Sequence, residues 1–224
     1  MTTPQNSNHA VISNATNPTP PSPPSTPGKI VVLNGFPGTG KLTILQRAKT
    51  LLPPATTLLV DNHLLIDPVA AVIPERSAEH HALRRAVRAP IFKKLAERAR
   101  AGCVVLMTAC LAEGDETDAA FLGEYVDMVR GSGVELFWVS VECEQTVLEE
   151  RVKSAGRGEG RMKLTDVGVL REMLGRYRLI EAGRRGDGGM RVVVRTLDVS
   201  GSVEGSVRDL MSVIGFPQGV VGSG

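Results

Sequence analysis

Short apolar runs alternate along the chain with longer segments in which apolar residues recur three and four positions apart. The short runs are rich in β-branched residues and predict five strands, at 30–33, 57–60, 104–108, 136–141 and 191–199. The longer segments predict helices at 41–51, 76–101, 117–130, 144–154, 167–182 and, with Ser202 as N-cap, up to 214. Uniformly apolar strands that are each followed by a helix predict an α/β fold, a three-layer αβα sandwich around a five-stranded parallel sheet.

Proline marks the limits of two of these helices. Pro53 and Pro54 stop the helix that begins at residue 41, and Pro90 is expected to kink or divide the long helix at 76–101. Ligands of parallel sheets bind beyond the carboxyl ends of the strands, so the residues that follow each strand are the candidates for chemistry.

Both ends of the chain differ in composition from the part between them. Residues 1–28 hold half of the 14 prolines and none of the Lys, Arg, Asp or Glu, which predicts a disordered, partly polyproline-like tail; an SH3-type ligand is the alternative interpretation. Residues 215–224 are rich in glycine and are expected to fray. The sequence therefore predicts one domain, at 29–214, between two tails.

A glycine-rich segment follows the first strand. It reads Gly35-Phe36-Pro37-Gly38-Thr39-Gly40-Lys41-Leu42-Thr43, the G-x4-G-K phosphate loop (Walker A) between a strand and a helix. Glycines allow successive backbone N–H groups to face one concavity, the helix N-terminus adds positive potential, and Lys41 can reach the β and γ phosphates of a nucleotide. All nine residues are therefore predicted to bind nucleotide. A hydroxyl usually follows the lysine and holds Mg²⁺, but here Leu42 intervenes and the hydroxyl belongs to Thr43.

The loop Gly-x-Pro-Gly-x-Gly-Lys-x-Thr resembles that of the adenylate kinases, in which the residue after the lysine is also not a hydroxyl. The resemblance implies a P-loop kinase fold of the nucleoside-monophosphate-kinase type. It also implies that Thr43 lies near the phosphates and that Mg²⁺ is held largely through water. Leu42 stands where adenylate kinases usually have glycine.

The second strand ends in Asp61, followed by Asn62 and His63. In gluconate kinase, shikimate kinase and chloramphenicol phosphotransferase-like proteins, which this region resembles, an acidic residue here lies beside the acceptor hydroxyl. The resemblance implies that Asp61 is a base or contacts Mg²⁺ through water; a turn or helix cap is the alternative. His63 is a candidate for substrate binding, or else a capping or packing residue.

Two groups of cations could contact anionic ligands. Residues 154–166 combine glycines with Arg157, Arg161 and Lys163, and in P-loop kinases this position is the lid, whose arginines close over the phosphates; a solvated basic loop is the alternative. Arg84 and Arg88 lie four positions apart on one helix face, suited to an anionic substrate or simply solvated. We predict catalytic roles for Arg157 and Arg161.

Strand three ends in Thr108-Ala109-Cys110, where a motor ATPase would carry an acidic pair. The absence of that pair favours transfer to a bound acceptor over hydrolysis, and no Asn-Lys-x-Asp motif indicates a GTPase. The three cysteines and four histidines are not in metal-ligand spacing, so we expect reduced core thiols, including a buried Cys110, and no zinc site.

The composition excludes further classes of protein. No apolar stretch approaches the roughly 20 residues of a membrane helix, and the N-terminus lacks the features of a secretory signal. A net charge of +2 and 4% aromatic residues argue against a nucleic-acid partner. We therefore expect a cytoplasmic protein, monomeric or homodimeric, without a membrane partner.

Together these features predict an ATP- and Mg²⁺-dependent phosphotransferase. Lys41 and Asp61 would act with the two lid arginines on ATP and a small-molecule or nucleotide acceptor, which the sequence does not identify. Two alternatives remain at this point: an ATP-binding module without turnover, and a polynucleotide 5′-kinase.

Overall fold

The computed structural model describes residues 26–153, 164–183 and 190–216. Five parallel strands form one sheet in the order β2-β3-β1-β4-β5. The strands are β1 (Lys29–Asn34), β2 (Thr57–Val60), β3 (Val104–Ala109), β4 (Glu135–Glu142) and β5 (Arg191–Asp198). The predicted α/β class and parallel sheet are confirmed.

Seven α-helices and one short 3₁₀ segment connect the described strands. They are α1 (Lys41–Thr50), η1 (Pro54–Thr56), α2 (His63–Ala70), α3 (Ala78–Arg100), α4 (Glu116–Asp127), α5 (Gln145–Lys153), α6 (Val167–Arg176) and α7 (Val203–Val213). None of the helices in the described ranges is long and apolar enough to cross a bilayer.

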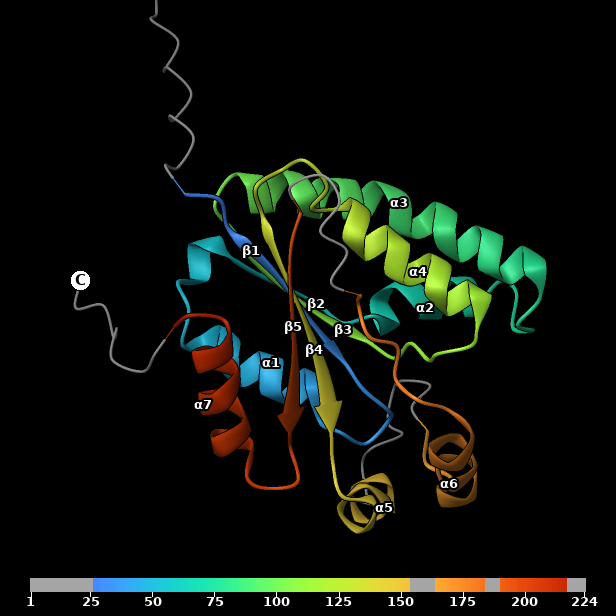
Figure 1. Ribbon diagram of the computed structural model, residues 1–224. Coiled ribbons are helices and arrows are strands. Elements are labelled where there is room, and N and C mark those ends of the chain that lie inside the picture. The colour runs from blue at the N-terminus through green and yellow to red at the C-terminus, as the bar shows by residue number, and fades with distance from the viewer. Residues whose placement is uncertain (1–25, 154–163, 184–189, 217–224) are drawn as a thin grey trace, which may run out of the picture.

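Helices cover both faces of the sheet, as the apolar strands require (Figure 1). Side chains of α3 and α4 pack on one face, and those of α1 and α7 pack on the other. Helices α5 and α6 lie beyond the carboxyl ends of the strands and share a small apolar cluster of their own. The sheet therefore separates two cores, and its carboxyl edge is left to the loops and to these two helices.

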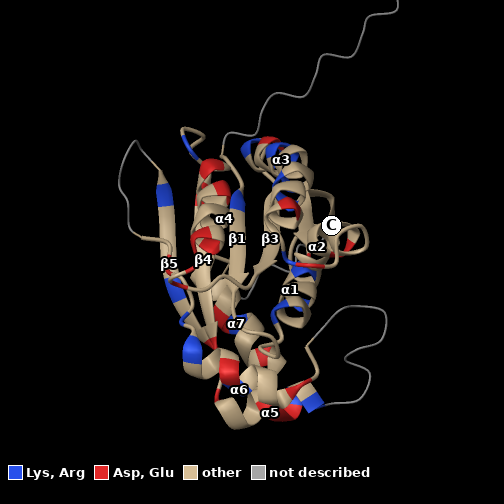
Figure 2. Cartoon of the chain, turned by 90° about the vertical axis from the view of Figure 1, so that its right-hand side faces the viewer, with Lys and Arg blue, Asp and Glu red and all other residues tan. Residues whose placement is uncertain are grey.

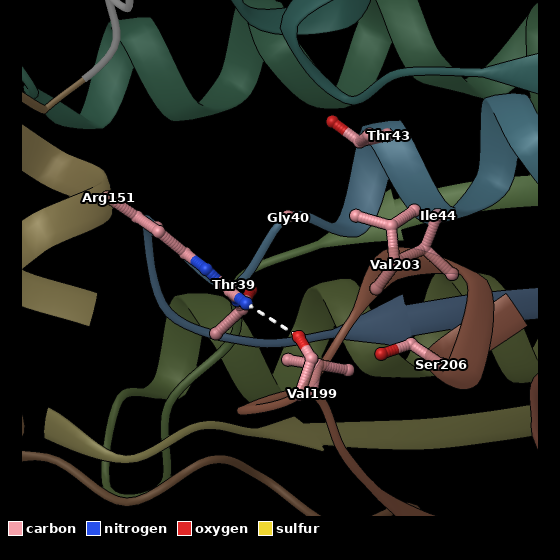
Figure 3. Close-up of a pocket in the computed structure, with 10 residues that line it drawn as sticks. Thr39, Gly40, Thr43, Ile44, Arg151, Val199, Val203 and Ser206 are labelled. Atoms are coloured by element: carbon pink, nitrogen blue, oxygen red, sulfur yellow. Dashed lines mark hydrogen bonds between the residues drawn. The ribbon is translucent and has the colours of Figure 1, made fainter. Parts of the chain in front are cut away.

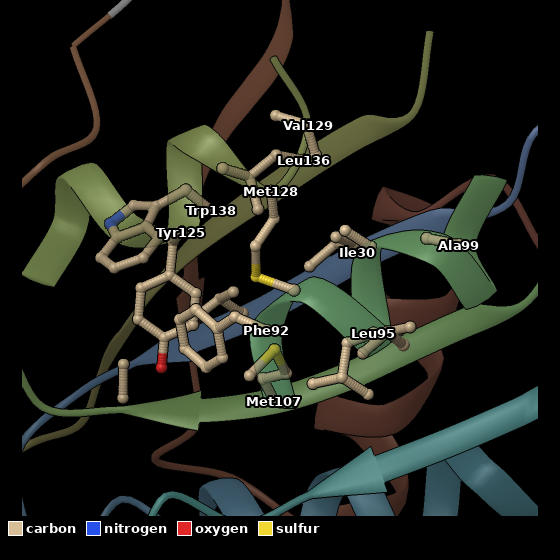
Figure 4. Close-up of a cluster of buried hydrophobic side chains, with 14 of the residues drawn as sticks. Ile30, Phe92, Leu95, Ala99, Met107, Tyr125, Met128, Val129, Leu136 and Trp138 are labelled. Carbon is tan, nitrogen blue, oxygen red and sulfur yellow. The ribbon is translucent and has the colours of Figure 1, made fainter. Parts of the chain in front are cut away.

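The core beneath α3 and α4 is built around aromatic rings (Figure 4). Tyr125 lies 5.0 Å from Phe92, 5.0 Å from Phe121 and 5.6 Å from Trp138, measured between ring centroids. Phe137 and Trp138 are both buried in β4, as the apolar run predicts. In Figure 2 the charged residues lie mainly on the helices and at strand ends, and Arg195 within the edge strand β5 is an exception.

The two ends of the described domain meet at the edge of the sheet opposite the glycine-rich loop. Lys29 starts β1, and its ammonium donates to the carbonyl of Ile214, at 2.8 Å, directly after α7. The same ammonium lies 5.2 Å from the ring of Phe137 and 5.3 Å from that of Phe216, and 3.9 Å from a carboxylate oxygen of Glu135. The first strand and the last helix are thereby joined.

The helices differ from the expected ones in three places. Helix α2 was not predicted, although it forms despite Pro68. Helix α3 is not divided at Pro90, because the carbonyl four residues earlier belongs to Ala86, which is exposed and can be hydrated. Helix α6 ends at Arg176 rather than at 182.

The residues after α6 form tertiary hydrogen bonds in place of helical ones. Ile180 donates its N–H to Leu111, and its carbonyl accepts from Trp138 Nε1 at 3.0 Å and from Asn34 Nδ2 at 3.3 Å. Asn34 also bonds both backbone groups of Leu111. This segment is therefore fixed to the loop after β3, just beyond the end of β1.

Candidate functional site

The glycine-rich loop curves around the ammonium of Lys41. Gly38 and Gly40 have φ angles of 98° and 80°, in the left-handed region that glycine adopts without strain. The curve brings Lys41 Nζ within hydrogen-bonding distance of the carbonyl of Phe36, at 2.9 Å, and of Thr39 Oγ1, at 3.2 Å. Helix α1 begins at Lys41, so the N–H groups of its first turn and the ammonium face one concavity, which suits a chain of phosphates.

Gly38 also joins this loop to α5. A Cβ at Gly38 would lie 3.1 Å from Val152 Cγ2 and 3.2 Å from Leu148 Cδ2, so the loop backbone packs directly against the helix. Leu148 and Val152 are buried with Leu170 of α6. Glu149 on α5 accepts two hydrogen bonds from Arg171 on α6, of 2.7 and 2.6 Å. The positions of the loop, α5 and α6 are thus linked.

A cavity of about 210 Å³ opens beside the start of α1 (Figure 3). Arg151 of α5 spans it, donating 3.2 Å to the carbonyl of Gly201 and 3.6 Å to Cys143 Sγ. The cavity is lined by Gly38, Thr39, Gly40, Thr43, Ile44, Arg151, Val199, Gly201, Val203 and Ser206. It joins the phosphate concavity to apolar side chains and one guanidinium, a combination that suits a nucleobase and its sugar.

Neither Arg151 nor any residue of the β5–α7 loop is among the residues predicted for the site. The local signal for Arg151 was that it is a cation in the last turn of the helix after strand four. The loop at 199–203 carried no motif, because the cavity arises only when β5 and α7 pack beside α1.

Asp61 lies at the carboxyl edge of the sheet, two strands from the glycine-rich loop. Only 6% of the residue is exposed. Thr108 Oγ1 at the end of β3 donates to Asp61 Oδ1 at 2.9 Å and accepts from the N–H of Asn62 at 2.9 Å. Thr108 lies at the end of β3, where a motor ATPase would carry an acidic pair. From there it fixes the carboxylate of Asp61, which follows β2.

His63 begins α2, and its Nδ1 lies 3.2 Å from Asp67 Oδ1, one turn along the same helix. Its side chain is partly exposed at the same edge as Asp61. This contact agrees with the packing interpretation, and substrate binding by His63 stays a prediction.

Arg88 has a structural contact that the sequence analysis did not foresee. It is buried, it donates to both carboxylate oxygens of Glu124 on α4, at 2.8 and 2.7 Å, and its guanidinium lies 3.7 Å from the centre of the Phe121 ring. Because Glu124 and the ring occupy this guanidinium, the expectation that Arg84 and Arg88 bind a substrate together needs correction. Arg84 does share the face, 5.9 Å from the same ring, and it remains a candidate.

Other predicted residues lie outside the site or outside the described ranges. Arg157 and Arg161, with Lys163, fall within 154–163, which the structure does not describe, so their roles stay predictions. Cys110 is exposed rather than buried, whereas Cys103 is buried as expected. Leu42 is partly buried in the first turn of α1, and Thr43 is exposed beside the cavity.

No protein-family model matches the sequence, and none of the curated proteins matches it. Solved structures do share its architecture. A protein from Chloroflexus aurantiacus J-10-fl, provisionally described as a kinase, is 14% identical, with a TM-score of 0.54 over 84% of this chain and 96% of the other. A sugar kinase from Janibacter sp. HTCC2649 is 18% identical, with a TM-score of 0.50 over 84% and 95%.

This chain has the fold of the P-loop kinases. The loop at 35–40, between β1 and α1, has with Lys41 the G-x4-G-K sequence pattern, and it is called the P-loop below. At these identities the likeness concerns the fold, and the reaction has to be argued from the P-loop and from the residues around it.

Proposed function

We propose that this P-loop kinase fold transfers the γ phosphate of ATP to a hydroxyl of a small-molecule or nucleotide acceptor. The observation that carries the proposal is the placement of a buried carboxylate, Asp61, at the same sheet edge as the P-loop. Adjacent strands lie about 4.8 Å apart, so the ends of β1 and β2, with β3 between them, are about 10 Å apart. An acceptor hydroxyl and a terminal phosphate fit into that interval.

The P-loop side fits ATP. Gly38 and Gly40 turn the backbone around the concavity, Lys41 lies within it, and the cavity beyond Thr43 receives the nucleoside. In this arrangement Arg151 packs against the base, and Val199 and Val203 supply apolar contact. The base is the part of the nucleotide that this cavity would select.

The acceptor side supplies proton transfer. The acceptor oxygen attacks the γ phosphorus, the bond from that phosphorus to the oxygen of ADP breaks, and Asp61 takes the hydroxyl proton. Thr108 holds the carboxylate in place for this role. Mg²⁺, which neutralises phosphate charge in such reactions, would be held through water by Thr43 and Asp61, whose oxygens are the hard ligands it prefers. Arg157 and Arg161 would add positive charge over the γ phosphate.

The test measures ADP release with Mg²⁺ and ATP over a panel of nucleoside monophosphates, sugar acids, neutral sugars and 5′-hydroxyl oligonucleotides. We expect one small-molecule class to stimulate release. Lys41→Ala should lower that rate by about 10²- to 10³-fold, the usual effect of removing a group that stabilises transition-state charge. Arg47→Ala is the matched control, because Arg47 is an exposed cation on the same helix, α1.

Each other outcome has a meaning. ATP binding without stimulation by any acceptor would contradict the proposal and identify a nucleotide-binding module. Stimulation by oligonucleotides alone would identify a polynucleotide kinase.

A further inference from the structure

Asn34 is the buried polar residue of β1. It is the last residue of that strand, directly before Gly35 of the P-loop, and none of its surface is exposed. Its Oδ1 accepts the N–H of Leu111 at 2.8 Å, and its Nδ2 donates to the carbonyl of Leu111 at 3.1 Å and to that of Ile180 at 3.3 Å. A buried carboxamide costs free energy unless it is bonded in this way, so these contacts allow a polar residue here.

Leu111 fixes the orientation of this amide. The N–H of Leu111 is a donor, so the oxygen of the Asn34 amide faces it and the nitrogen faces the two carbonyls. The carbonyl of Ile180 also accepts from Trp138 Nε1, at 3.0 Å, and the N–H of Ile180 donates to the carbonyl of Leu111 at 3.0 Å. Asn34 and Trp138 therefore hold Ile180 at the end of β1 by side-chain donors.

Ile180 belongs to the segment that joins α6 to the rest of the chain, four positions after the helix ends. No described residue of α6 is part of either large core, and its buried residue, Leu170, packs with Leu148 and Val152 of α5. Both helices lie beyond the carboxyl ends of the strands (Figure 1). The position of α6 relative to the P-loop therefore depends on α5 and on the bonds of Asn34 and Trp138 to Ile180.

Helix α5 carries the guanidinium that spans the nucleotide cavity. Arg151 extends from this helix and donates to a carbonyl of the β5–α7 loop at 3.2 Å (Figure 3). Two hydrogen bonds from Arg171 of α6 to Glu149 of α5 couple the positions of the two helices. A continuous series of contacts thus runs from Asn34 through Ile180, α6 and α5 to Arg151.

We propose that Asn34 is a positioning residue of the nucleotide site: through Ile180 it holds α5 and α6 where Arg151 spans the nucleotide cavity. Because Asn34 is buried, it acts without touching the nucleotide. The inference rests on the proposed function only in that a nucleotide occupies the P-loop and the cavity beside it. It does not require phosphoryl transfer.

The test measures the Kd of ATP by calorimetry, without Mg²⁺ and well below the Tm of every variant. Asn34→Leu keeps a side chain of similar size and removes the bonds to Leu111 and Ile180. We expect the Kd to rise by about 3- to 30-fold, the range by which substitutions in a contact network change binding at a distant site. An unchanged Kd would overturn the inference.

Trp138→Phe is a second, milder variant. It removes the other side-chain donor to the Ile180 carbonyl and keeps an aromatic ring in the core. It should raise the Kd of ATP in the same direction by a smaller factor, and it carries the test if Asn34→Leu does not fold. A rise in Asn34→Leu that Trp138→Phe does not share would mean that the effect reaches the P-loop directly through Gly35, and it would overturn the route through Ile180.

Two further variants control for a purely structural role. Ser140 lies beside Asn34 in the register of β4, and its hydroxyl is buried without a hydrogen-bond partner in the described ranges, so Ser140→Ala should leave the Kd unchanged. Leu136 is buried near the other end of β4, so Leu136→Ala opens a cavity there and should lower the Tm with no change in Kd. A Kd that rises in Leu136→Ala as much as in Asn34→Leu would mean that stability governs binding and would overturn the inference.

A double-mutant cycle tests the route to Arg151. Arg151→Ala should itself weaken ATP binding, because it removes the guanidinium from the cavity. In that background Asn34→Leu should change the Kd by less than about twofold, since the group that Asn34 positions is gone. Additive losses would overturn the inference. Failure of the wild type to bind ATP would contradict the proposed function and the inference together, whereas ATP binding without turnover, with the expected Kd changes, would contradict the proposed function and support the inference.

Discussion

The two sides of the P-loop are built in different ways. On the side of α1 and α7, the candidate nucleotide site is made of backbone turns at glycine, one cavity and a single spanning guanidinium, that of Arg151. On the other side, the candidate acceptor site depends on the buried carboxylate of Asp61, at the end of β2, which Thr108 of β3 holds in place. Groups on the backbone are fixed by local sequence, whereas charges in a protein interior depend on distant partners.

The largest expected effect concerns the acceptor side. Asp61→Asn keeps the size of the side chain and removes the proton acceptor, so we expect kcat to fall by about 10²- to 10⁴-fold. The affinity for ATP, measured by calorimetry without Mg²⁺, should stay within about threefold, since the nucleotide cavity lies on the other side of the loop. An equal loss of ATP affinity would mean that Asp61 serves the nucleotide side instead, and the comparison would fail.

A second prediction tests whether Arg88 stabilises the fold or binds the acceptor. Arg88→Met removes two of the hydrogen bonds of the largely buried Glu124 carboxylate and leaves it the longer contact with Arg85, at 3.3 Å, which should lower the free energy of unfolding by about 1–3 kcal/mol. Urea denaturation measures the change, and adding Glu124→Leu should recover much of it. Unchanged stability together with a higher KM for the acceptor would show that Arg88 binds substrate after all.

A third prediction concerns the nucleotide side, where backbone shape matters most. Gly38→Ala places a Cβ at a φ of 98° and against Val152 and Leu148, so we expect a loss of about 1–2 kcal/mol in stability and weaker ATP binding. Gly123→Ala is the matched control. Nothing lies within 4 Å of a Cβ at Gly123, which is inside α4, so alanine there should stabilise the protein by up to about 1 kcal/mol.

The smallest effect compares the ion pair of Glu149 with Arg171, an arginine whose side chain is 60% exposed, with the pair of Glu124 and Arg88, an arginine that is 6% exposed. Hydrogen bonds from Arg171 and Gln145 lower the pKa of Glu149 from 4.5 to about 2. A lowered carboxyl pKa gives stability that is present above about pH 4.5 and is lost as the pH falls toward 2. The difference in Tm between wild type and Glu149→Gln should therefore be small at pH 7 and vanish near pH 2, and high salt should reduce it. A Tm difference that persists at pH 2 would contradict the stabilising role of the Glu149 charge.

The same contrast explains what sequence could and could not predict. All five strands were predicted, because a short apolar run rich in β-branched residues can be identified without tertiary information. The P-loop and Asp61 were predicted for a similar reason: both follow directly from a strand end. Helix α2 was missed because Asp61 and Asn62 resemble a turn and Pro68 resembles a break.

Some contacts and one helix end could not be predicted from the sequence. Arg88 and Glu124 are 36 positions apart, and no local signal links them. The helical pattern at 167–182 continued past Arg176, but hydrogen bonds from Trp138 and Asn34 to Ile180 favour an extended segment there. Periodicity reports which face of a segment is apolar, and it does not report which polar groups elsewhere will compete for its backbone.

The bond from Lys29 to Ile214 has a practical consequence. It brings the first strand and the last helix together at the edge of the sheet opposite the P-loop, about 20 Å away along β1. A fluorophore or surface tether attached just before Lys29 or just after Phe216 would therefore start from the face remote from both ligand sites. Immobilised in that orientation, the protein would present its catalytic edge to solution whichever end carried the tether.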